Sequence, residues 1–493
     1  MTMMSVRTAA AWAITSQYAS FAIQFVTSVV LARWFITPAD LGLFSIAFAA
    51  ISLISFLQDF GITRYINGER ELTPDKIQTA FSVSAAFAFA VAVAAVISAW
   101  PVAWFYGDPR LLPICLVIAA SYLMIPFAVV PQALCQRRMD YRSNTMIEVG
   151  SAVANAAVAI ALALRGHGAL ALAWGAFAQQ FARMAVGQWR AGGMLPWPPR
   201  FSQAESIVEI GRTSSILSVC WSIITRAPEL VIGRILGNVA VGLFSRASGL
   251  AIQLRLLVAG AVTGVFYPAF RAVRDRGEPL GPPYIRVVAA YTGIAWPAMA
   301  GIAALAWPLI DILYGERWLA AAPLLLWIAL AQLCYVAVPL NGDLPILLDR
   351  MPGLIRRNMI DTAVSVGLLA LAAPFGLLWV AVSRFAHGLL WIALFMPFMR
   401  SMLHFSWGDL AKVWGKSALA TLAAVTPVLA SYALWHGPQQ ANIGQVVGGA
   451  LAGIALWYAT LIATHHPLHS ELVGIVADLR KAVFGQRSAA SGQ

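Results

Sequence analysis

The stretch LARWFITPADLGLFS, Leu31 to Ser45, has a second copy about 200 residues later in IGRILGNVAVGLFS, Ile232 to Ser245. In each copy an arginine closes an apolar run, and the tetrad GLFS lies at the start of the next apolar run. The chain therefore repeats the same junction between two apolar segments. A repeated junction predicts that the whole chain is an internal duplication.

Composition restricts the class of protein. Of the 493 residues, 60% are hydrophobic and 11% are charged, and the mean hydropathy is +0.75. Soluble domains carry about 25% charged residues, whereas one helical crossing of a bilayer needs about 20 mostly apolar residues. The chain is therefore predicted to be an integral membrane protein.

Apolar stretches of sufficient length follow one another almost from end to end. The Ala-rich stretch SVSAAFAFAVAVAAVISAW suits close helix packing in lipid, whereas porin strands would show short alternating segments. The predicted fold class is all-α, a polytopic integral membrane protein with about 14 transmembrane helices. The predicted spans are 8–34, 40–62, 77–105, 111–136, 145–165, 168–190, 205–235, 240–270, 283–313, 319–348, 354–373, 376–399, 416–436 and 442–464.

The distribution of lysine and arginine predicts the orientation. Most of these residues fall in loops on the side of the N-terminus, and the first apolar stretch is longer than a signal-peptide core. The opposite loops hold only Arg33, Arg110, Arg165, Arg234 and Arg317. Because basic loops stay cytoplasmic, both termini are predicted to be cytoplasmic. This asymmetry explains the net charge of +12 without nucleic acid as a partner.

The duplication extends beyond the repeated junction. AWPVAWFYGDPRL, from Ala99, matches AWPLIDILYGERWL, from Ala306, and Glu148 and Asp361 end the matching stretches NTMIE and NMID. An even number of predicted spans separates equivalent points, so the copies are parallel repeats, an architecture found in transporters. The predicted divisions are an N-terminal lobe at 1–200, a C-terminal lobe at 201–402, an interfacial segment with the last two spans at 403–466, and a cytoplasmic tail at 467–493.

Two polar stripes predict a cavity between the lobes. One helical face of the first span carries Gln17, Ser20, Gln24, Thr27 and Ser28, and a similar stripe follows the seventh span from Ser215 to Glu229. Isolated polar residues in a span often only bond a neighbouring helix. Two matching stripes on equivalent spans favour the lining of a cavity.

Ionisable residues within spans are candidate site residues, because each costs about 2.5–3.5 kcal/mol or more at the helix centre. They are Arg226, Glu229, Arg246, Arg255, Arg384 and His387. Arg226 and Glu229 either contact a ligand or form an ion pair within their helix, and Arg246 and Arg255 cannot both face one cavity. Arg384 has no acidic neighbour within one turn, which makes it the best candidate for binding an anion.

The repeat-related acids Glu148 and Asp361 have two possible roles. They lie near the predicted cytoplasmic ends of their spans, where they could couple transport to an ion. The alternative is that they pair with Arg142 and Arg357, and this alternative is favoured.

Metal and cofactor motifs are not found. The four cysteines fall within predicted spans without metal-ligand spacing, so they are interpreted as packing residues. The chain has no GxxxxGK[ST] motif, so no cofactor is expected and the chain itself is not expected to use ATP.

Over roughly residues 10–400 the chain resembles the polysaccharide transporter branch of the multidrug/oligosaccharidyl-lipid/polysaccharide flippase superfamily. The resemblance is carried by LARWFITPADLGLFSIAF, FLQDFGITRYINGERELTPDKIQTAF, WFYGDPRL, PQALCQRRMDYRSN, ELVIGRILGNVAVGLFSRA and VFYPAFRAVRD. It implies a V-shaped pair of helical bundles that moves an undecaprenyl-diphosphate-linked oligosaccharide across the bacterial inner membrane. One departure is APEL ahead of IGR, with Pro228 and Glu229 where relatives often have an aspartate.

The predicted function is thus a flippase for O-antigen, capsule or exopolysaccharide synthesis, not an enzyme. Its expected partners are the anionic lipid-linked oligosaccharide, membrane lipids and a polysaccharide polymerase with its export machinery. Three alternatives remain: a multidrug or small-molecule exporter of the same superfamily, a membrane-embedded glycosyltransferase or polymerase, and a scaffold that does not transport. The exporter would favour carboxylates at membrane depth, and the enzyme would need a sizeable periplasmic loop.

Overall fold

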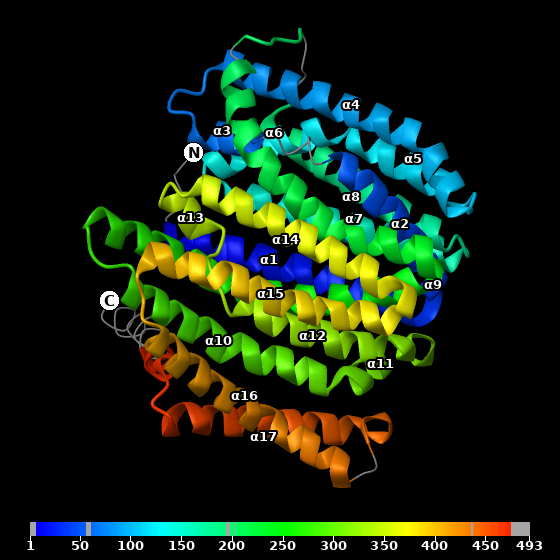
Figure 1. Ribbon diagram of the computed structural model, residues 1–493. Coiled ribbons are helices and arrows are strands. Elements are labelled where there is room, and N and C mark those ends of the chain that lie inside the picture. The colour runs from blue at the N-terminus through cyan, green and yellow to red at the C-terminus, as the bar shows by residue number, and fades with distance from the viewer. Residues whose placement is uncertain (1–5, 56–60, 194–197, 203, 435–436, 475–493) are drawn as a thin grey trace, which may run out of the picture. The chain divides into compact units, whose positions relative to one another are not determined.

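A computed structural model describes residues 6–55, 61–193, 198–202, 204–434 and 437–474. All regular elements in these ranges are helices, so the predicted all-α class is confirmed (Figure 1). The chain divides into two compact units, Met1–Ser245 and Arg246–Gln493. The boundaries of the predicted lobes, interfacial segment and tail stay predictions.

The helices of the first unit begin with a long helix that ends in one π-helical turn, Leu31–Phe35. They are α1 (Val6–Val30), α2 (Pro38–Ile54), α3 (Ile62–Gly68), α4 (Pro74–Tyr106), α5 (Leu111–Tyr122), α6 (Ile125–Arg137), α7 (Tyr141–Leu164) and α8 (Ala169–Ala191). Helix α9 (Ala204–Asp275) crosses the boundary between the units and is broken at Gly237, whose φ is 84° and ψ 175°.

The second unit contains the remaining helices. They are α10 (Gly281–Ala304), α11 (Ala306–Tyr314), α12 (Ala322–Val336), α13 (Asp343–Leu347), α14 (Met351–Ala372), α15 (Leu377–Leu403), α16 (Trp407–Leu434) and α17 (Ile443–Ala463). Helices α16 and α17 lie side by side, and α16 packs on α10 (Figure 1).

Ten of the described helices are long and apolar enough to cross a membrane, and the bent pair α5 and α6 would make eleven. The predicted number of spans therefore stays a prediction. Predicted span 111–136 is broken into α5 and α6 with a bend of 42°, at a point where Pro126 in the first turn of α6 brings no backbone N–H. Pro228, by contrast, lies inside α9, and the break in that helix is at Gly237.

The repeated junction is shaped differently in its two copies. In the first, the Thr37 hydroxyl accepts a hydrogen bond from the Asp40 N–H, and the Asp40 carboxylate accepts one from the Thr37 N–H at 3.1 Å. This capping box, with Pro38 at the start of α2, fixes where the helix begins. In the second copy Gly237 supplies the turn, because a positive φ is least costly for glycine.

The two copies contact each other inside the first unit. A Cβ added at Gly42 would overlap the carbonyl oxygen of Asn238, and one added at Gly242 would overlap the carbonyl oxygen of Pro38. Gly242 lies 200 residues after Gly42, and Asn238 lies 200 residues after Pro38, so the contact is reciprocal. We name these four residues the junction contact. Only glycine allows the two backbones to approach so closely.

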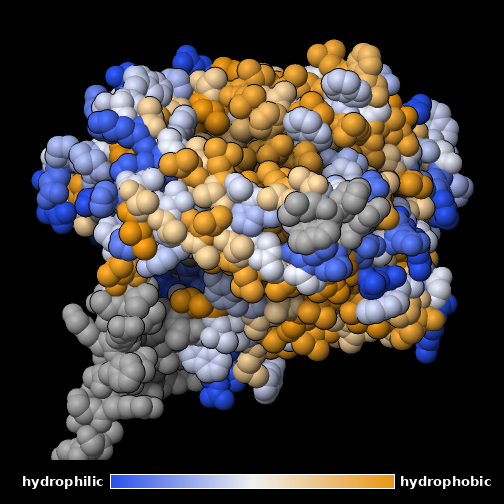
Figure 2. Space-filling view, turned by 90° about the horizontal axis from the view of Figure 1, so that it is seen from below, coloured by the Kyte–Doolittle hydropathy of each residue, from blue (hydrophilic) through white to orange (hydrophobic). Residues whose placement is uncertain are grey.

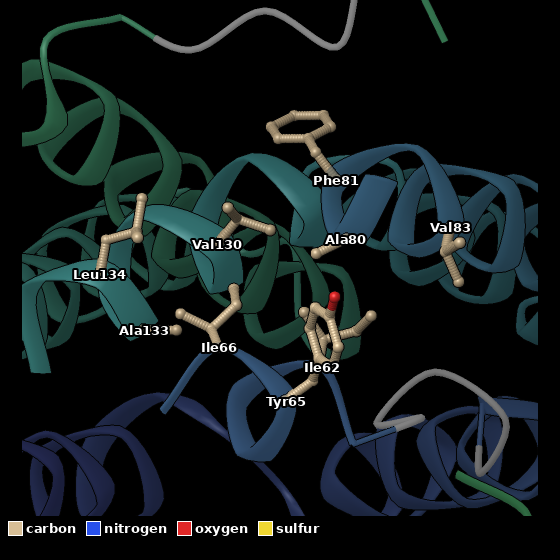
Figure 3. Close-up of a cluster of buried hydrophobic side chains, with 9 residues drawn as sticks. All are labelled: Ile62, Tyr65, Ile66, Ala80, Phe81, Val83, Val130, Ala133 and Leu134. Atoms are coloured by element: carbon tan, nitrogen blue, oxygen red, sulfur yellow. The ribbon is translucent and has the colours of Figure 1, made fainter. Parts of the chain in front are cut away.

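A hydrophobic cluster holds the short helix α3 in place. Figure 3 shows Ile62, Tyr65 and Ile66 of α3 packed against side chains of α4 and α6. Phe81 of α4 also meets Phe127 of α6 edge to face, with ring centroids 5.1 Å apart. Burial of these side chains anchors α3 against α4 and α6.

The outer surface is apolar, as a bilayer requires. Figure 2 shows hydrophobic residues over much of the visible surface. Single large side chains such as Trp104 and Phe375 are 74% and 76% exposed. The four cysteines are free and buried, which supports their interpretation as packing residues. Within the described ranges, no group of three or more His, Cys, Asp or Glu side chains could hold a metal ion.

Helices α16 and α17 are attached to α10 through buried polar groups. The hydroxyl oxygens of Thr292 and Ser417 lie 2.8 Å apart, and Ser417 Oγ lies 3.0 Å from His466 Nε2. Leu468, within the predicted tail, is buried against Ala290 and Leu461. The segment that was expected to form a separate interfacial helix is the first part of α16.

Candidate functional site

A buried polar cluster lies among helices α12, α14 and α15 of the second unit. His387 of α15 places Nε2 2.9 Å from the Asp361 carboxylate of α14 and Nδ1 2.6 Å from the Tyr335 hydroxyl of α12. Asp361 is 5% exposed and His387 is 1% exposed. A carboxylate, an imidazole and a phenol thus form a continuous hydrogen-bonded row inside apolar helices.

Arg384 lies one turn before His387 on α15 and bonds the same neighbouring helix. Its guanidinium donates to the Ser365 hydroxyl at 3.0 Å and to the Ser365 carbonyl at 2.9 Å. Because Asp361 and Ser365 are one turn apart on α14, the two helices face each other with two polar pairs. Arg384 and His387 therefore lie on one face of α15, and this face contacts α14.

The expected pairing of Asp361 with Arg357 is wrong. Arg357 donates instead to the Gly353 carbonyl at 3.1 Å, and its guanidinium lies 3.9 Å from the centroid of the Phe398 ring. The spacing of one turn would allow an ion pair, but the Arg357 guanidinium lies on the Phe398 ring instead. Asp361 points across to α15 instead.

The expected pairing of Glu148 with Arg142 is also wrong. Glu148 of α7 accepts hydrogen bonds from Arg183 of α8 at 3.0 Å and from Gln132 of α6 at 2.7 Å. Positions six apart on a helix do not share a face, so Arg142 cannot approach the acid along the same helix. The true partners come from the two helices packed beside α7.

The two repeat-related acids therefore have the same kind of position and different chemistry. Each accepts a hydrogen bond from the helix that follows it, α8 or α15, and α6 or α12 completes each cluster. The partner of Glu148 is an arginine, which always carries its charge, whereas the partner of Asp361 is a histidine, which titrates near neutral pH in its ordinary state.

Three further candidates lie along α9. Arg226 and Glu229 are one turn apart on the part of α9 that belongs to the first unit. The Arg226 guanidinium lies 4.8 Å from the centroid of the Phe48 ring. Arg246 belongs to the second unit, and its guanidinium lies 4.8 Å and 5.0 Å from the Tyr314 and Trp318 ring centroids. Cation–π interactions with these rings offset part of the free-energy cost of burying the two arginines among helices.

The polar stripe of α1 is divided by the fold. Gln17 and Gln24 are exposed, whereas Ser20 and Thr27 are buried. The Thr27 hydroxyl donates to the Ile23 carbonyl at 2.7 Å, as a hydroxyl does when no other acceptor is near. Ser28 is half-buried, so the two glutamines are the exposed members of this stripe.

Sequence reasoning missed four members of the two clusters: Tyr335, Ser365, Gln132 and Arg183. Tyr335 and Ser365 stand alone in apolar runs, so no sequence pattern marks them. Arg183 lies within predicted span 168–190, and the cost of an arginine at such a position was the signal that could have found it.

Comparison with known proteins gives one family and several relatives. The family model described as "Polysaccharide biosynthesis protein" matches residues 30–323. The chain is 25% identical over 388 residues to the succinoglycan biosynthesis transport protein ExoT of Rhizobium meliloti (strain 1021), covering 75% of this chain and 76% of that protein. It is 22% identical over 318 residues to the lipopolysaccharide biosynthesis protein WzxC of Escherichia coli (strain K12), covering 64% of each.

Solved structures show the same fold. The lipid II flippase MurJ in an inward closed conformation aligns with a TM-score of 0.74 and 11% identity, over 94% of this chain and 99% of that chain. An inward-facing multidrug resistance MATE family transporter aligns with a TM-score of 0.56 and 15% identity, over 79% of this chain and 95% of that chain.

Proposed function

Because the chain belongs to the family of polysaccharide biosynthesis proteins, we propose that it is a flippase for lipid-linked oligosaccharides of a bacterial inner membrane. It moves repeat units linked to undecaprenyl diphosphate from the cytoplasmic to the periplasmic leaflet, for O-antigen, capsule or exopolysaccharide synthesis. The observation that carries the proposal is the family match, supported by relatives named for succinoglycan transport and lipopolysaccharide biosynthesis.

The physical task accords with the fold. An oligosaccharide diphosphate is large, hydrated and anionic, so it needs a polar path with cations, while its lipid tail stays in the bilayer. The long apolar helices and a few cations within them meet these two requirements. The chain acts by alternating access of its two repeats, as a transporter rather than an enzyme, with both termini in the cytoplasm and a polysaccharide polymerase with its export machinery as partners.

The headgroup is proposed to bind along a path of cations and polar side chains. Its cations are Arg226, Arg246 and Arg384, and His387, Glu229, Gln17 and Gln24 complete the path. Arginine binds phosphate bidentately, and charge-assisted bonds are about twice as strong as neutral ones. Because Arg384 bonds Ser365, binding there requires it to exchange the serine for a phosphate oxygen. Glu148 and Asp361 are the two candidates for an ion-coupling group.

Leaflet exchange by purified protein tests the proposal. Liposomes containing the protein and a lipid-linked oligosaccharide are treated from outside with an impermeant sugar-oxidising reagent. We expect the protected inner-leaflet fraction to become accessible with functional protein and to stay protected with heat-denatured protein. An unchanged protected fraction would refute the flippase. Accumulation of a cationic dye in the same vesicles would support the exporter alternative instead.

A further inference from the structure

We infer that the row Asp361–His387–Tyr335 binds the proton that couples this transport to a pH gradient, and that the equivalent Glu148 cluster does not. The inference rests on the proposed function and specifies which of the two repeat-related acids takes part. It stands on three observations: the burial of the row, its hydrogen-bond geometry, and the different partners of the two acids.

The hydrogen-bond geometry accommodates one additional proton. With a neutral imidazole, the Tyr335 hydroxyl donates to His387 Nδ1, and Nε2–H donates to the Asp361 carboxylate. When the imidazole binds a proton, both ring nitrogens are donors. The Nδ1–H then donates to the Tyr335 oxygen, and the phenolic hydrogen must find a different acceptor. The proton forms an N–H bond on His387, and no other bond breaks.

The reversed hydrogen bond between Tyr335 and His387 affects the packing of three helices. The row connects α12 through Tyr335, α15 through His387 and α14 through Asp361. The half-buried Tyr335 must then turn its hydroxyl away from His387, because a donor left without an acceptor costs about 1–3 kcal/mol. Binding of one proton to His387 is therefore coupled to the relative positions of α12, α14 and α15.

The charged and titratable groups that act on Tyr335 come from α9, α12, α14 and α15. Arg384 of α15 and Arg255 of α9 both act electrostatically on Tyr335, as do Asp361 and Cys334. Arg357, on α14 itself, is turned toward Gly353 and Phe398. The two arginines keep their charge at every physiological pH. Among these neighbours, His387 has the ring nitrogen, Nδ1, that can bind a proton in place of the hydrogen bond from the Tyr335 hydroxyl.

The Glu148 cluster has the same arrangement without this capacity. Its partners are Arg183 and Gln132, and neither gains or loses a proton near neutral pH. Because Arg183 stands where the second copy has His387, the hydrogen bonds to Glu148 always run from the arginine and the glutamine to the carboxylate. The repeat has thus kept the acid in both copies, and only the second copy has a switchable partner.

The test measures accumulation against a pH gradient in the liposomes described above. One coupled proton per substrate shifts the final ratio between the leaflets by about tenfold for each pH unit of gradient, since about 1.4 kcal/mol corresponds to tenfold. We expect wild-type protein to show this dependence. In His387→Gln, and in the double variant Asp361→Asn with His387→Gln, the final ratio should be the same at every gradient, whatever the rate at which it is reached.

Two variants serve as controls. His466→Gln replaces another buried histidine of the same unit, and Glu148→Gln neutralises the equivalent acid; both should keep the wild-type dependence on the gradient. If His387→Gln does not accumulate in membranes, Tyr335→Phe removes only the hydroxyl and should weaken the dependence. A gradient-independent ratio for wild-type protein, or a wild-type dependence in His387→Gln, would overturn the inference. Failure of wild-type protein to exchange the substrate at all would refute the proposed function instead.

Discussion

Arg384 shows how a buried cation can be stable before it meets a ligand. The side chain is 8% exposed, and two of its nitrogens donate to Ser365. An arginine held in this way is already oriented, so a phosphate oxygen that replaces the serine hydroxyl meets a positioned donor. Ser365 thereby becomes a natural control for any test of Arg384.

Replacement of Arg384 should impair export of the lipid-linked oligosaccharide. Each hydrogen bond to a charged group contributes about 1.5–3 kcal/mol, so Arg384→Ala should reduce transport by about tenfold to a hundredfold. Arg384→Lys should restore part of the rate, because it keeps the charge but not the bidentate geometry. Accumulation of the lipid-linked substrate is measured beside membrane abundance of the protein. Ser365→Ala should affect transport less, and normal export by Arg384→Ala at normal abundance would exclude the anion site.

Arg226 and Glu229 give a second test at this scale. If Arg226 binds the headgroup, Arg226→Ala should reduce transport more than Glu229→Gln does. The double variant Arg226→Gln with Glu229→Gln should also be inactive, because it lacks the cation. Good transport by the double variant would mean that the arginine serves only to neutralise its neighbour.

Site residues could be predicted from the sequence where an ionisable side chain lies within a span or where the two repeats align. His387 and Arg384 stood out because ionisable groups at membrane depth are costly, and Glu148 and Asp361 because the repeat aligns them. Their partners were not predictable. The expected Arg142 and Arg357 are near in sequence, whereas Arg183 and His387 come from the adjacent helix. Which side chain crosses between helices depends on packing that one sequence does not contain.

At the scale of elements, the junction contact determines how closely α2 approaches α9. Gly42→Ala or Gly242→Ala would force a methyl group into a backbone carbonyl, which a flexible side chain cannot relieve. We expect a loss of about 1–3 kcal/mol of stability, the usual cost of overpacking, together with reduced transport. Unfolding temperature in detergent and leaflet exchange are the measurements. Gly249→Ala, also on α9 with no atom near the added Cβ, is the matched control and should behave as wild type.

The attachment of α16 and α17 should depend on pH through His466. Burial and the nearby Lys416 ammonium lower the pKa of His466 from 6.5 to about 4. Between these pH values the unfolded chain binds a proton that the folded chain does not, so stability falls as the pH drops from 6.5 toward 4. The unfolding temperature in detergent should decrease over this window, and His466→Gln should decrease it less. Equal pH profiles for the two proteins would contradict this account.

Element boundaries were largely predictable, and breaks were not. Hydropathy placed most span ends within several residues of the helix ends, because an apolar run long enough to cross a bilayer has few other stable forms. A proline inside a span can kink a helix, yet α9 breaks at Gly237 and not at Pro228. Predicted span 111–136 breaks at Leu123 and Met124. Proline is tolerated where packing supports it, so its presence alone did not locate the bends.

For the whole molecule, the family predicted from the sequence blocks is confirmed by the matching family model. Orientation follows from the charge of the loops and stays a prediction. Reporters fused after Lys76, Arg138 and Arg276, and at Gln493, should indicate cytoplasm, because basic loops remain on that side. Reporters near Asp108 and Gly437 should indicate periplasm. A periplasmic signal from Gln493 would require a different number of spans.

The junction contact also bears on how such a chain could arise. Pro38 contacts Gly242 as Asn238 contacts Gly42, which is the relation that a two-fold axis imposes on two identical subunits. An interface of that kind is self-complementary, so one gene product could have formed it by pairing with itself. Fusion of two such copies would leave each glycine opposite its former counterpart. The repeated LGLFS and VGLFS would then preserve the dimer interface of a shorter ancestor, now enclosed within one polypeptide.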